Sequence, residues 1–400
     1  DFNMAYFNNW CQNYLMDHCF NVHYAADVKK RYPDLLVNTV GSIMSIDYAE
    51  KIIANGWADF VSMCRPLMAD PDMPRKYAEN RPEDRRPCLR CNTCMNHLMI
   101  PKPIYCAINP ISAMTSELRD GVVPKARKKK RVAIVGGGPG GIQALQTLLD
   151  RGHDVTLYEK SSQLGGNVIG AATPPFKVDV QDYLKWMRHT AAQCVKRGAR
   201  IYLNLECTKD ILDKEGYDAV VIAVGAEPIV PGKIPGIRKP HVAWAPDAER
   251  GLAKVGDEIV IVGAGQVGLE AALDFAEQGK KVTVIEMMDQ MTAMFKSRGS
   301  RDLMKKMADD GIKFDVFYGT ALEEVKDDCV VAKDVKTGEK KEFKADTVLL
   351  AMGIRPRLEL VDQLRHSCPE TSVVIVGDCN NKAGTISEAV NQAFQGCLHI

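Results

Sequence analysis

The sequence predicts an α/β protein in which the C-terminal part of a (β/α)8 barrel precedes two nested Rossmann-like dinucleotide-binding domains. Two observations support this class: a glycine-rich strand–turn–helix pattern occurs twice, and strand–helix units precede both copies. The composition agrees, because 46% hydrophobic and 26% charged residues with a net charge of +1 are typical of globular proteins. A chain of 400 residues is long enough for two or three domains.

The first part of the chain contains two strand–helix units. DLLVNTVGS (34–42) is predicted to be a buried strand followed by a helix, and WADFVSMCRPL (57–67) a second strand. The loops after the last two strands of a (β/α)8 barrel form a phosphate site, which suits the amide of Gly41 and the guanidinium of Arg65. A helix-capping glycine and a surface arginine remain the alternative. A whole barrel needs about 250 residues, so this segment could supply only its last part.

Four of the thirteen cysteines lie in RPCLRCNTCMNHLMIPKPIYC (86–106). Disulfide scaffolds are normally small and secreted, so a large α/β chain favours reduced thiols. Closely spaced thiolates followed by a distant one can each bind one iron of a cluster. Zinc is the alternative metal, although four-cysteine zinc sites normally consist of two C-x2-C pairs. We therefore predict a metal site at Cys88, Cys91, Cys94 and Cys106.

The first glycine-rich pattern is RVAIVGGGPGGIQALQTLLDRGHDVTLYEK. Gly136 would form the tight turn, Gly138 would let the backbone approach a pyrophosphate, and Gly141 would let helix and strand pack closely. Glu159 ends the second strand about 20 residues later, where a carboxylate binds ribose hydroxyls. Strand, glycines, helix, strand and acid together predict a dinucleotide site.

The second copy is EIVIVGAGQVGLEAALDFAEQGKKVTVIEMMD, with Gly263, Gly265, Gly268 and Glu286 in the same places. A carboxylate at Glu286 would accept a hydrogen bond from a free ribose 2′-hydroxyl and repel a 2′-phosphate. The residues that follow it contain no arginine to offset that charge. We expect NADH here rather than NADPH. The alternative is that Glu286 faces solvent.

Residues 130–400 resemble the two-dinucleotide-binding architecture of the flavoprotein disulfide reductases. The resemblance rests on the two glycine patterns, the LGGN turn with Gly166 and Asn167, and a terminal Gly-Asp at Asp378. It implies that the first fold binds FAD, that the second binds a nicotinamide, and that Asp378 reaches the flavin ribityl chain. No C-x-x-C or C-x4-C pair lies near the first glycines, so we do not expect a disulfide reductase.

The segment VSMCRPLMADPDMPRKYAENRPEDRRPCLRCNTC resembles the end of the flavin barrel in the 2,4-dienoyl-CoA reductase and enoate reductase family of old-yellow-enzyme-like proteins. The resemblance implies FMN, with its phosphate at Gly41 and Arg65, and a [4Fe–4S] cluster on the four cysteines. The spacing between Cys91 and Cys94 resembles the trimethylamine dehydrogenase branch instead. The domains expected are the barrel part (1–85), the cluster segment and linker (86–129), the FAD domain (130–240 and 366–400) and the NAD(P)H domain (241–365).

The resemblance implies an NADH-dependent ene-reductase that reduces an activated C=C bond of an enoate, enone or enoyl-CoA. Electrons would pass from NAD(P)H to FAD, to the cluster and to FMN. The substrate acid of this family lies earlier in the barrel, so the catalytic residue is unknown in this chain. Two alternatives are a trimethylamine-dehydrogenase-like amine dehydrogenase and a non-catalytic electron-transfer (diaphorase) module.

The remaining expectations concern partners and location. Balanced charge argues against nucleic acid, and the sequence lacks a run of 18 apolar residues that could span a membrane. We expect a small unsaturated substrate, a possible homo-oligomer and a cytoplasmic location. The first residue is Asp1 and not methionine, so we also expect a longer natural chain.

Overall fold

A computed structural model describes residues 11–98, 103–113, 118, 121–296, 298–367 and 372–400. The chain divides into two compact units. The first contains Asp1–Val168, Val178–Ala226 and Pro356–Ile400, and the second contains Ile169–Lys177 and Glu227–Arg355. Two of the chain's crossings between the units lie in paired strands, β7 (Ala226–Pro228) and β16 (Ile354–Pro356).

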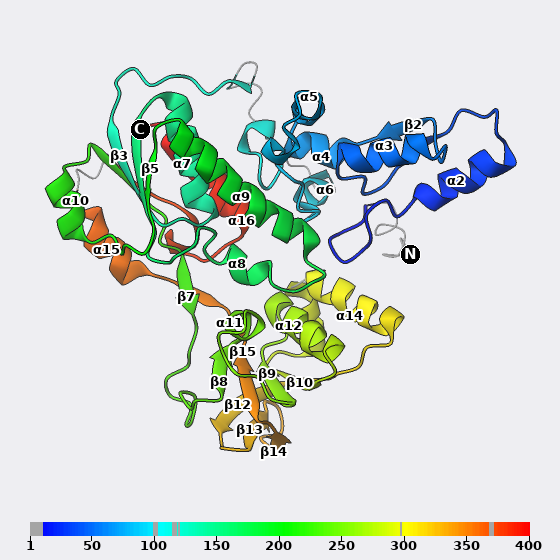
Figure 1. Cartoon of the computed structure of the whole chain (residues 1–400). Coiled ribbons are helices and arrows are strands. Elements are labelled where there is room, and N and C mark those ends of the chain that lie inside the picture. The colour runs from blue at the N-terminus through cyan, green and yellow to red at the C-terminus, as the bar shows by residue number, and fades with distance from the viewer. Residues whose placement is uncertain (1–10, 99–102, 114–117, 119–120, 297, 368–371) are drawn as a thin grey trace. The chain divides into compact units, whose positions relative to one another are not determined.

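A five-stranded parallel sheet organises most of the first unit (Figure 1). Its strand β3 is buried at four of five positions, as expected for a continuous apolar run covered on both faces. Helix α16 packs on α7, and α7 on α9. The strands, in sheet order, are β17 (Val373–Ile375), β6 (Ala219–Ile222), β3 (Arg131–Val135), β4 (Asp154–Tyr158) and β5 (Arg200–Tyr202). The helices are α7 (Pro139–Arg151), α9 (Val178–Lys196), α10 (Lys209–Glu215), α15 (Leu358–Arg365) and α16 (Ile386–Cys397), with η5 at Gly377–Cys379.

The second unit repeats this topology. In both sheets the glycine-loop strand is central, and the next strand outwards is the one that leads to the glutamate, Glu159 just after β4 and Glu286 at the end of β10. The parallel sheet order is β11 (Asp315–Tyr318), β10 (Lys281–Glu286), β9 (Glu258–Val262), β15 (Thr347–Leu350) and β8 (Val242–Trp244), beside an antiparallel sheet of β12 (Thr320–Val325), β13 (Cys329–Asp334) and β14 (Lys340–Lys344). The helices are α11 (Ala245–Glu249), α12 (Gln266–Glu277), α13 (Gln290–Lys296) and α14 (Arg298–Asp310), and α8 (Val168–Ala171) lies at the unit boundary.

The N-terminal segment contains both predicted strand–helix units as a two-stranded parallel sheet over a core that includes Ile43 and Ile52. The predicted strand over 57–67 is too long, because its second half is helix α4. Pro66 fits that first helical turn, where a missing N–H costs nothing. The elements are α2 (Val22–Arg31), β1 (Asn38–Val40), α3 (Ile46–Ala54), β2 (Phe60–Ser62), α4 (Cys64–Ala69), α5 (Met73–Ala78), η1 (Pro82–Asp84), α6 (Thr93–Leu98) and η2 (Pro110–Ala113).

A closed barrel is not shown, since this sheet has two strands in the part of the chain that the structure describes. Two of its apolar side chains are exposed, Val40 by 55% and Phe60 by 57%. Parallel sheets are normally covered on both faces, so the exposure of these apolar side chains is unusual for such a sheet. The barrel therefore stays a prediction. Among the described residues, no helix is long and apolar enough to cross a membrane.

Candidate functional site

The first glycine loop has the geometry of a dinucleotide site. Gly136 adopts a φ of 112°, and a Cβ there would lie 2.3 Å from the main-chain oxygen of Ala223. A Cβ on Gly141 would lie 1.9 Å from the main-chain oxygen of Gly136. Gly138 caps the start of α7, where a Cβ would meet only the Cα of Gly166, at 3.9 Å. The helix N-terminus therefore faces open space suited to a pyrophosphate.

Glu159 is held against this loop. One carboxylate oxygen accepts a 2.7 Å hydrogen bond from the amide of Gly137, and the other accepts from the amide and hydroxyl of Ser161, at 2.8 and 2.7 Å. A carboxylate can accept about four hydrogen bonds, so capacity remains for ribose hydroxyls. Its side chain is already oriented before a nucleotide binds.

The other two predicted FAD segments converge on the same loop. Gly166 has a φ of 54°, and a Cβ there would lie 3.1 Å from the Cα of Gly138. The next residue, Asn167, forms a side-chain hydrogen bond with Asp378, which also accepts from the amide of Gly384 at 2.9 Å. Burial raises the pKa of the Asp378 carboxyl, and these two hydrogen bonds partly oppose the rise. Residues far apart in the sequence thus form one site.

The second glycine loop is built in the same way. Gly263 has a φ of 112°, and a Cβ on Gly268 would lie 1.9 Å from the main-chain oxygen of Gly263. Gly265 caps α12, and a Cβ there would meet open space out to 4 Å. Glu286 is 5% exposed and accepts hydrogen bonds from the amides of Ala264 and Met288, at 2.8 and 2.9 Å. Glu286 therefore does not face bulk solvent.

A buried ion pair in the second unit was not predicted from the sequence. Lys177 Nζ lies 2.5 Å from Glu270 Oε1, and both side chains are less than a tenth exposed. Gln266 also donates to that oxygen, at 3.0 Å. Burial, followed by the nearby charges of Asp274 and Glu270, raises the pKa of Glu249 to about 8. The sequence held one signal for a functional role of Glu270, which is its place two positions after Gly268 in the first part of α12.

The four cysteines lie close enough to affect one another electrostatically. Burial raises the pKa of Cys94 to about 11, and also raises the pKa values of Cys88 and Cys106, with a further contribution from Cys91 in each case. Nowhere in the described residues do three or more His, Cys, Asp or Glu side chains converge on a point that could hold one metal ion. The four thiols supply the number of ligands that a four-iron cluster needs, one for each iron, and the cluster stays a prediction.

The two predicted phosphate-binding residues lie in one neighbourhood. Arg65 is in the first turn of α4, and its Nη2 donates to the hydroxyl of Ser42 at 3.1 Å. Ser42 directly follows Gly41, which has a φ of 136°. A Cβ on Gly41 would lie 2.6 Å from Nδ2 of Asn21, so the backbone conformation and the neighbouring side chain both require glycine. Whether a phosphate binds here stays a prediction.

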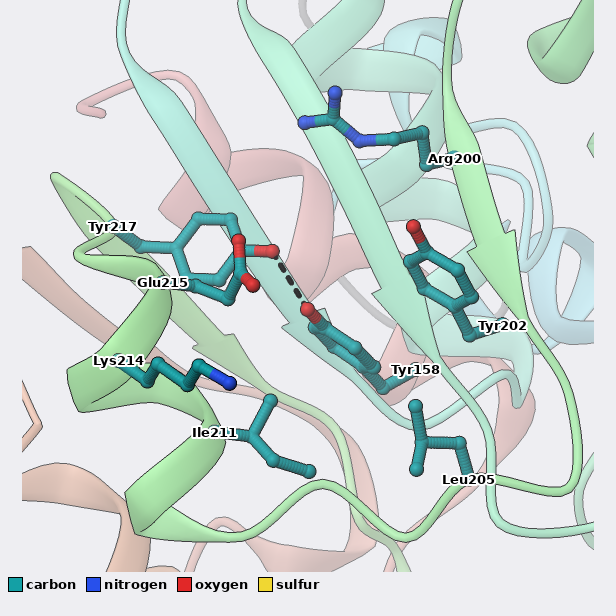
Figure 2. A pocket seen from close by; sticks show the side chains of 8 residues that line it. All are labelled: Tyr158, Arg200, Tyr202, Leu205, Ile211, Lys214, Glu215 and Tyr217. Carbon is teal, nitrogen blue, oxygen red and sulfur yellow. Dashed lines mark hydrogen bonds between the residues drawn. The ribbon is translucent and has the colours of Figure 1, made fainter.

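A separate pocket of about 230 Å³ opens on the first sheet beside α10 (Figure 2). The rings of Tyr158 and Tyr202 stack with centroids 5.5 Å apart, and the hydroxyls of Tyr158 and Tyr217 lie 2.7 Å apart. None of the predicted site residues lines it. The lining residues are Tyr158, Arg200, Tyr202, Leu205, Ile211, Lys214, Glu215 and Tyr217.

Comparison with known proteins gives relatives that are longer than this chain. It is 33% identical to NADH oxidase from Thermoanaerobacter brockii over 383 residues, 93% of this chain and 56% of that protein. It is 31% identical to cinnamate reductase from Clostridium sporogenes over 380 residues, 94% of this chain and 54% of that protein. The chain thus spans about half the length of these relatives.

A solved structure agrees over nearly the whole chain. The complex of 2-naphthoyl-CoA reductase with 2-naphthoyl-CoA superposes with a TM-score of 0.86 at 30% identity, covering 97% of this chain and 57% of that one. The family model for pyridine nucleotide-disulphide oxidoreductases matches residues 130–393, which include both glycine loops. This chain, with its two nucleotide folds, belongs to the pyridine nucleotide-disulphide oxidoreductase family.

Proposed function

We propose that this chain is part of an NADH-dependent flavin and iron–sulfur oxidoreductase that reduces an activated C=C bond in an enoate, enone or enoyl-CoA. FAD, a [4Fe–4S] cluster and FMN would supply the redox chemistry, in that order from the nicotinamide. The residues proposed to hold FAD are the first glycine loop, Glu159, Asn167 and Asp378. The two relatives and the solved structure that carry reductase or NADH oxidase names support this class.

One observation carries the proposal: the second unit repeats the carboxylate-to-loop geometry of the first. Glu286 accepts from Ala264 at 2.8 Å, as Glu159 accepts from Gly137 at 2.7 Å. A buried carboxylate in this position favours a cofactor with a free 2′-hydroxyl. The residues thus suit NADH as the electron donor, and NADPH less well.

The second glycine loop also supports this proposal over an amine dehydrogenase. Such an enzyme delivers its electrons to a carrier protein and needs no nicotinamide site, yet Gly263, Gly265 and Gly268 keep the geometry of one. A diaphorase would need the FAD and NADH sites but no FMN. The paired positions of Ser42 and Arg65 therefore support an enzyme that also holds FMN.

The test is cofactor analysis of the protein expressed from its complete reading frame and purified without oxygen. We expect about four irons with matching sulfide, one FAD and one FMN per chain, all bleached by NADH. Oxidation by a cinnamate, a cyclic enone or an enoyl-CoA would then be followed by absorbance. Zinc without sulfide would contradict the cluster, and cofactors that NADH leaves oxidised would favour the amine dehydrogenase.

A further inference from the structure

We propose that Arg65 is a positioning residue that joins the cysteine loop to the predicted FMN phosphate loop, an inference that rests on the proposed function. Its Nη1 donates to Oδ1 of Asn92 at 2.8 Å and to the main-chain oxygen of Gln12 at 2.6 Å. Its Nη2 donates to the hydroxyl of Ser42 at 3.1 Å. Asn92 stands between Cys91 and Cys94, and Ser42 follows Gly41, so one guanidinium contacts both predicted sites.

Asn92 transmits this contact to the cysteine loop. Its φ is 57° and that of Arg90 is 47°, so the residues on both sides of Cys91 adopt left-handed conformations. Asparagine adopts this conformation more readily than most residues, whereas it is costly for Arg90. Asn92 is held by Arg65 and by its Nδ2, which donates to the main-chain oxygen of Cys11 at 3.1 Å. These side-chain contacts link the residue next to Cys91 to Arg65.

The opposite side of the loop has its own anchor. Arg90 is 3% exposed, and its Nε donates to Asp179 of α9 at 2.7 Å. Asp179 also pairs with Nε2 of His18, at 2.9 Å. Because Arg90 is fixed independently, a change at Asn92 or Arg65 should disturb the loop locally without releasing it from α9.

Charge adds to the geometry. The guanidinium of Arg65 places a positive charge beside the cysteine loop through its contact with Asn92. That charge would favour a cluster that gains an electron, since the reduced form carries more negative charge. A guanidinium also has more N–H donors than these three contacts use, so donors remain for phosphate oxygens.

The experiment compares Arg65→Met, Asn92→Ala and a control, Arg75→Met, in the protein from the complete reading frame. Arg75 lies on α5, is 64% exposed at its side chain and pairs with Asp72 across the surface, so its replacement removes the same charge. Three quantities are measured: FMN content, iron content, and the reduction potential and EPR spectrum of the cluster. Circular dichroism confirms folding.

We expect Arg65→Met to weaken FMN binding about tenfold, to make the cluster potential more negative, and to alter its EPR spectrum. Asn92→Ala should alter the spectrum or lower the iron content while FMN binding stays normal. Arg75→Met should change none of these. Asn92→Ala keeps the test informative if Arg65→Met fails to fold, because it leaves the contact between Arg65 and Ser42 in place.

Two results would overturn the proposed role of Arg65 in joining the two loops, but not the proposed function. The first is Arg65→Met that loses FMN but keeps the unmodified potential and spectrum; the second is Asn92→Ala with an unmodified spectrum and iron content. Absence of iron from the unmodified protein would instead overturn the proposed function, and this inference with it.

Discussion

At the scale of single residues, two buried carboxylates define the nucleotide sites. Glu159 and Glu286 each accept main-chain hydrogen bonds from the glycine loop and from the residues that follow the strand. These bonds orient the carboxylate before the ligand arrives, so little side-chain entropy is lost on binding. We therefore propose that the two glutamates act as fixed acceptors for ribose.

Replacing Glu286 by glutamine should weaken NADH binding about 10- to 100-fold, because a hydrogen bond to a charged group contributes roughly 1.5–3 kcal/mol. NADPH binding should weaken less, since the carboxylate that repels its phosphate is gone. Isothermal titration with both coenzymes measures this change. Glu339→Gln, on an exposed residue of the same unit, is the control. An unchanged ratio of NADH to NADPH affinity would contradict the role of Glu286.

The raised pKa of Asp378 predicts that its carboxylate lowers the stability of the fold at neutral pH, while the same group contributes to FAD binding. Because burial raises its pKa, the folded protein holds this proton more tightly than the unfolded chain, and the resulting stability is lost as the pH rises through the folded-state value. Asp378→Asn should therefore have an equal melting temperature near pH 4 and a higher one at pH 8. Its FAD affinity should fall about tenfold. A melting-temperature difference that is the same at both pH values would argue against this role of burial.

At the scale of elements, the strand–turn–helix unit explains why glycines are needed at different points for different reasons. Gly268 lies against the main chain of its own loop, with a Cβ position 1.9 Å from an oxygen, whereas Gly265 faces open space at the start of α12. Gly268 allows the close packing of the loop and helix, whereas Gly265 leaves space in which a ligand could bind.

This difference predicts that two alanine substitutions in the second unit have different effects, one on stability and the other on NADH binding. Gly268→Ala must shift α12 from β9 and should lower the free energy of unfolding by about 1–3 kcal/mol. Gly265→Ala should change it by less than about 1 kcal/mol but reduce NADH binding, because the methyl group would occupy the pyrophosphate side. Urea unfolding and coenzyme titration separate the two effects. Equal destabilisation by both substitutions would show that the two glycines do not have these separate roles.

At the scale of the whole molecule, two units with the same topology each carry one glycine loop. Each sheet has its own core, with Val260 and Val348 among the buried residues of the second unit and Val220 and Ile222 among those of the first. Separate cores allow each site to be stabilised by its own ligand.

Hydrogen exchange should therefore respond unit by unit. Added NAD⁺ at about 100 times its dissociation constant stabilises the site that binds it by about 2.7 kcal/mol. We expect slower exchange in β9 and the first turn of α12, and unchanged exchange in β3 and the first turn of α7, which added FAD should protect instead. Mass spectrometry of peptides from the two loops measures this. Protection of β3 by NAD⁺ would mean that the assignment of the two nucleotides is wrong.

Features with local signals could be predicted from the amino-acid sequence. Both glycine loops, their terminal glutamates and the nucleotide-fold strands follow from short-range patterns of glycine, apolar residues and one acid, because each pattern folds within a single strand–turn–helix unit. The family match over residues 130–393 confirms the two-nucleotide-fold family for that part of the chain. The boundary between strand and helix near Pro66 was wrong, because an apolar run does not distinguish a buried strand from a buried helix.

The tertiary structure alone decided which distant residues meet. Nothing in the sequence near Lys177 predicts its pairing with Glu270, and nothing near Arg65 predicts contact with Asn92. Such contacts depend on how separate elements pack, and packing is set by the whole core rather than by neighbours along the chain. Composition and spacing could suggest the ligands of each site, but only the folded chain shows that one arginine lies between two of them.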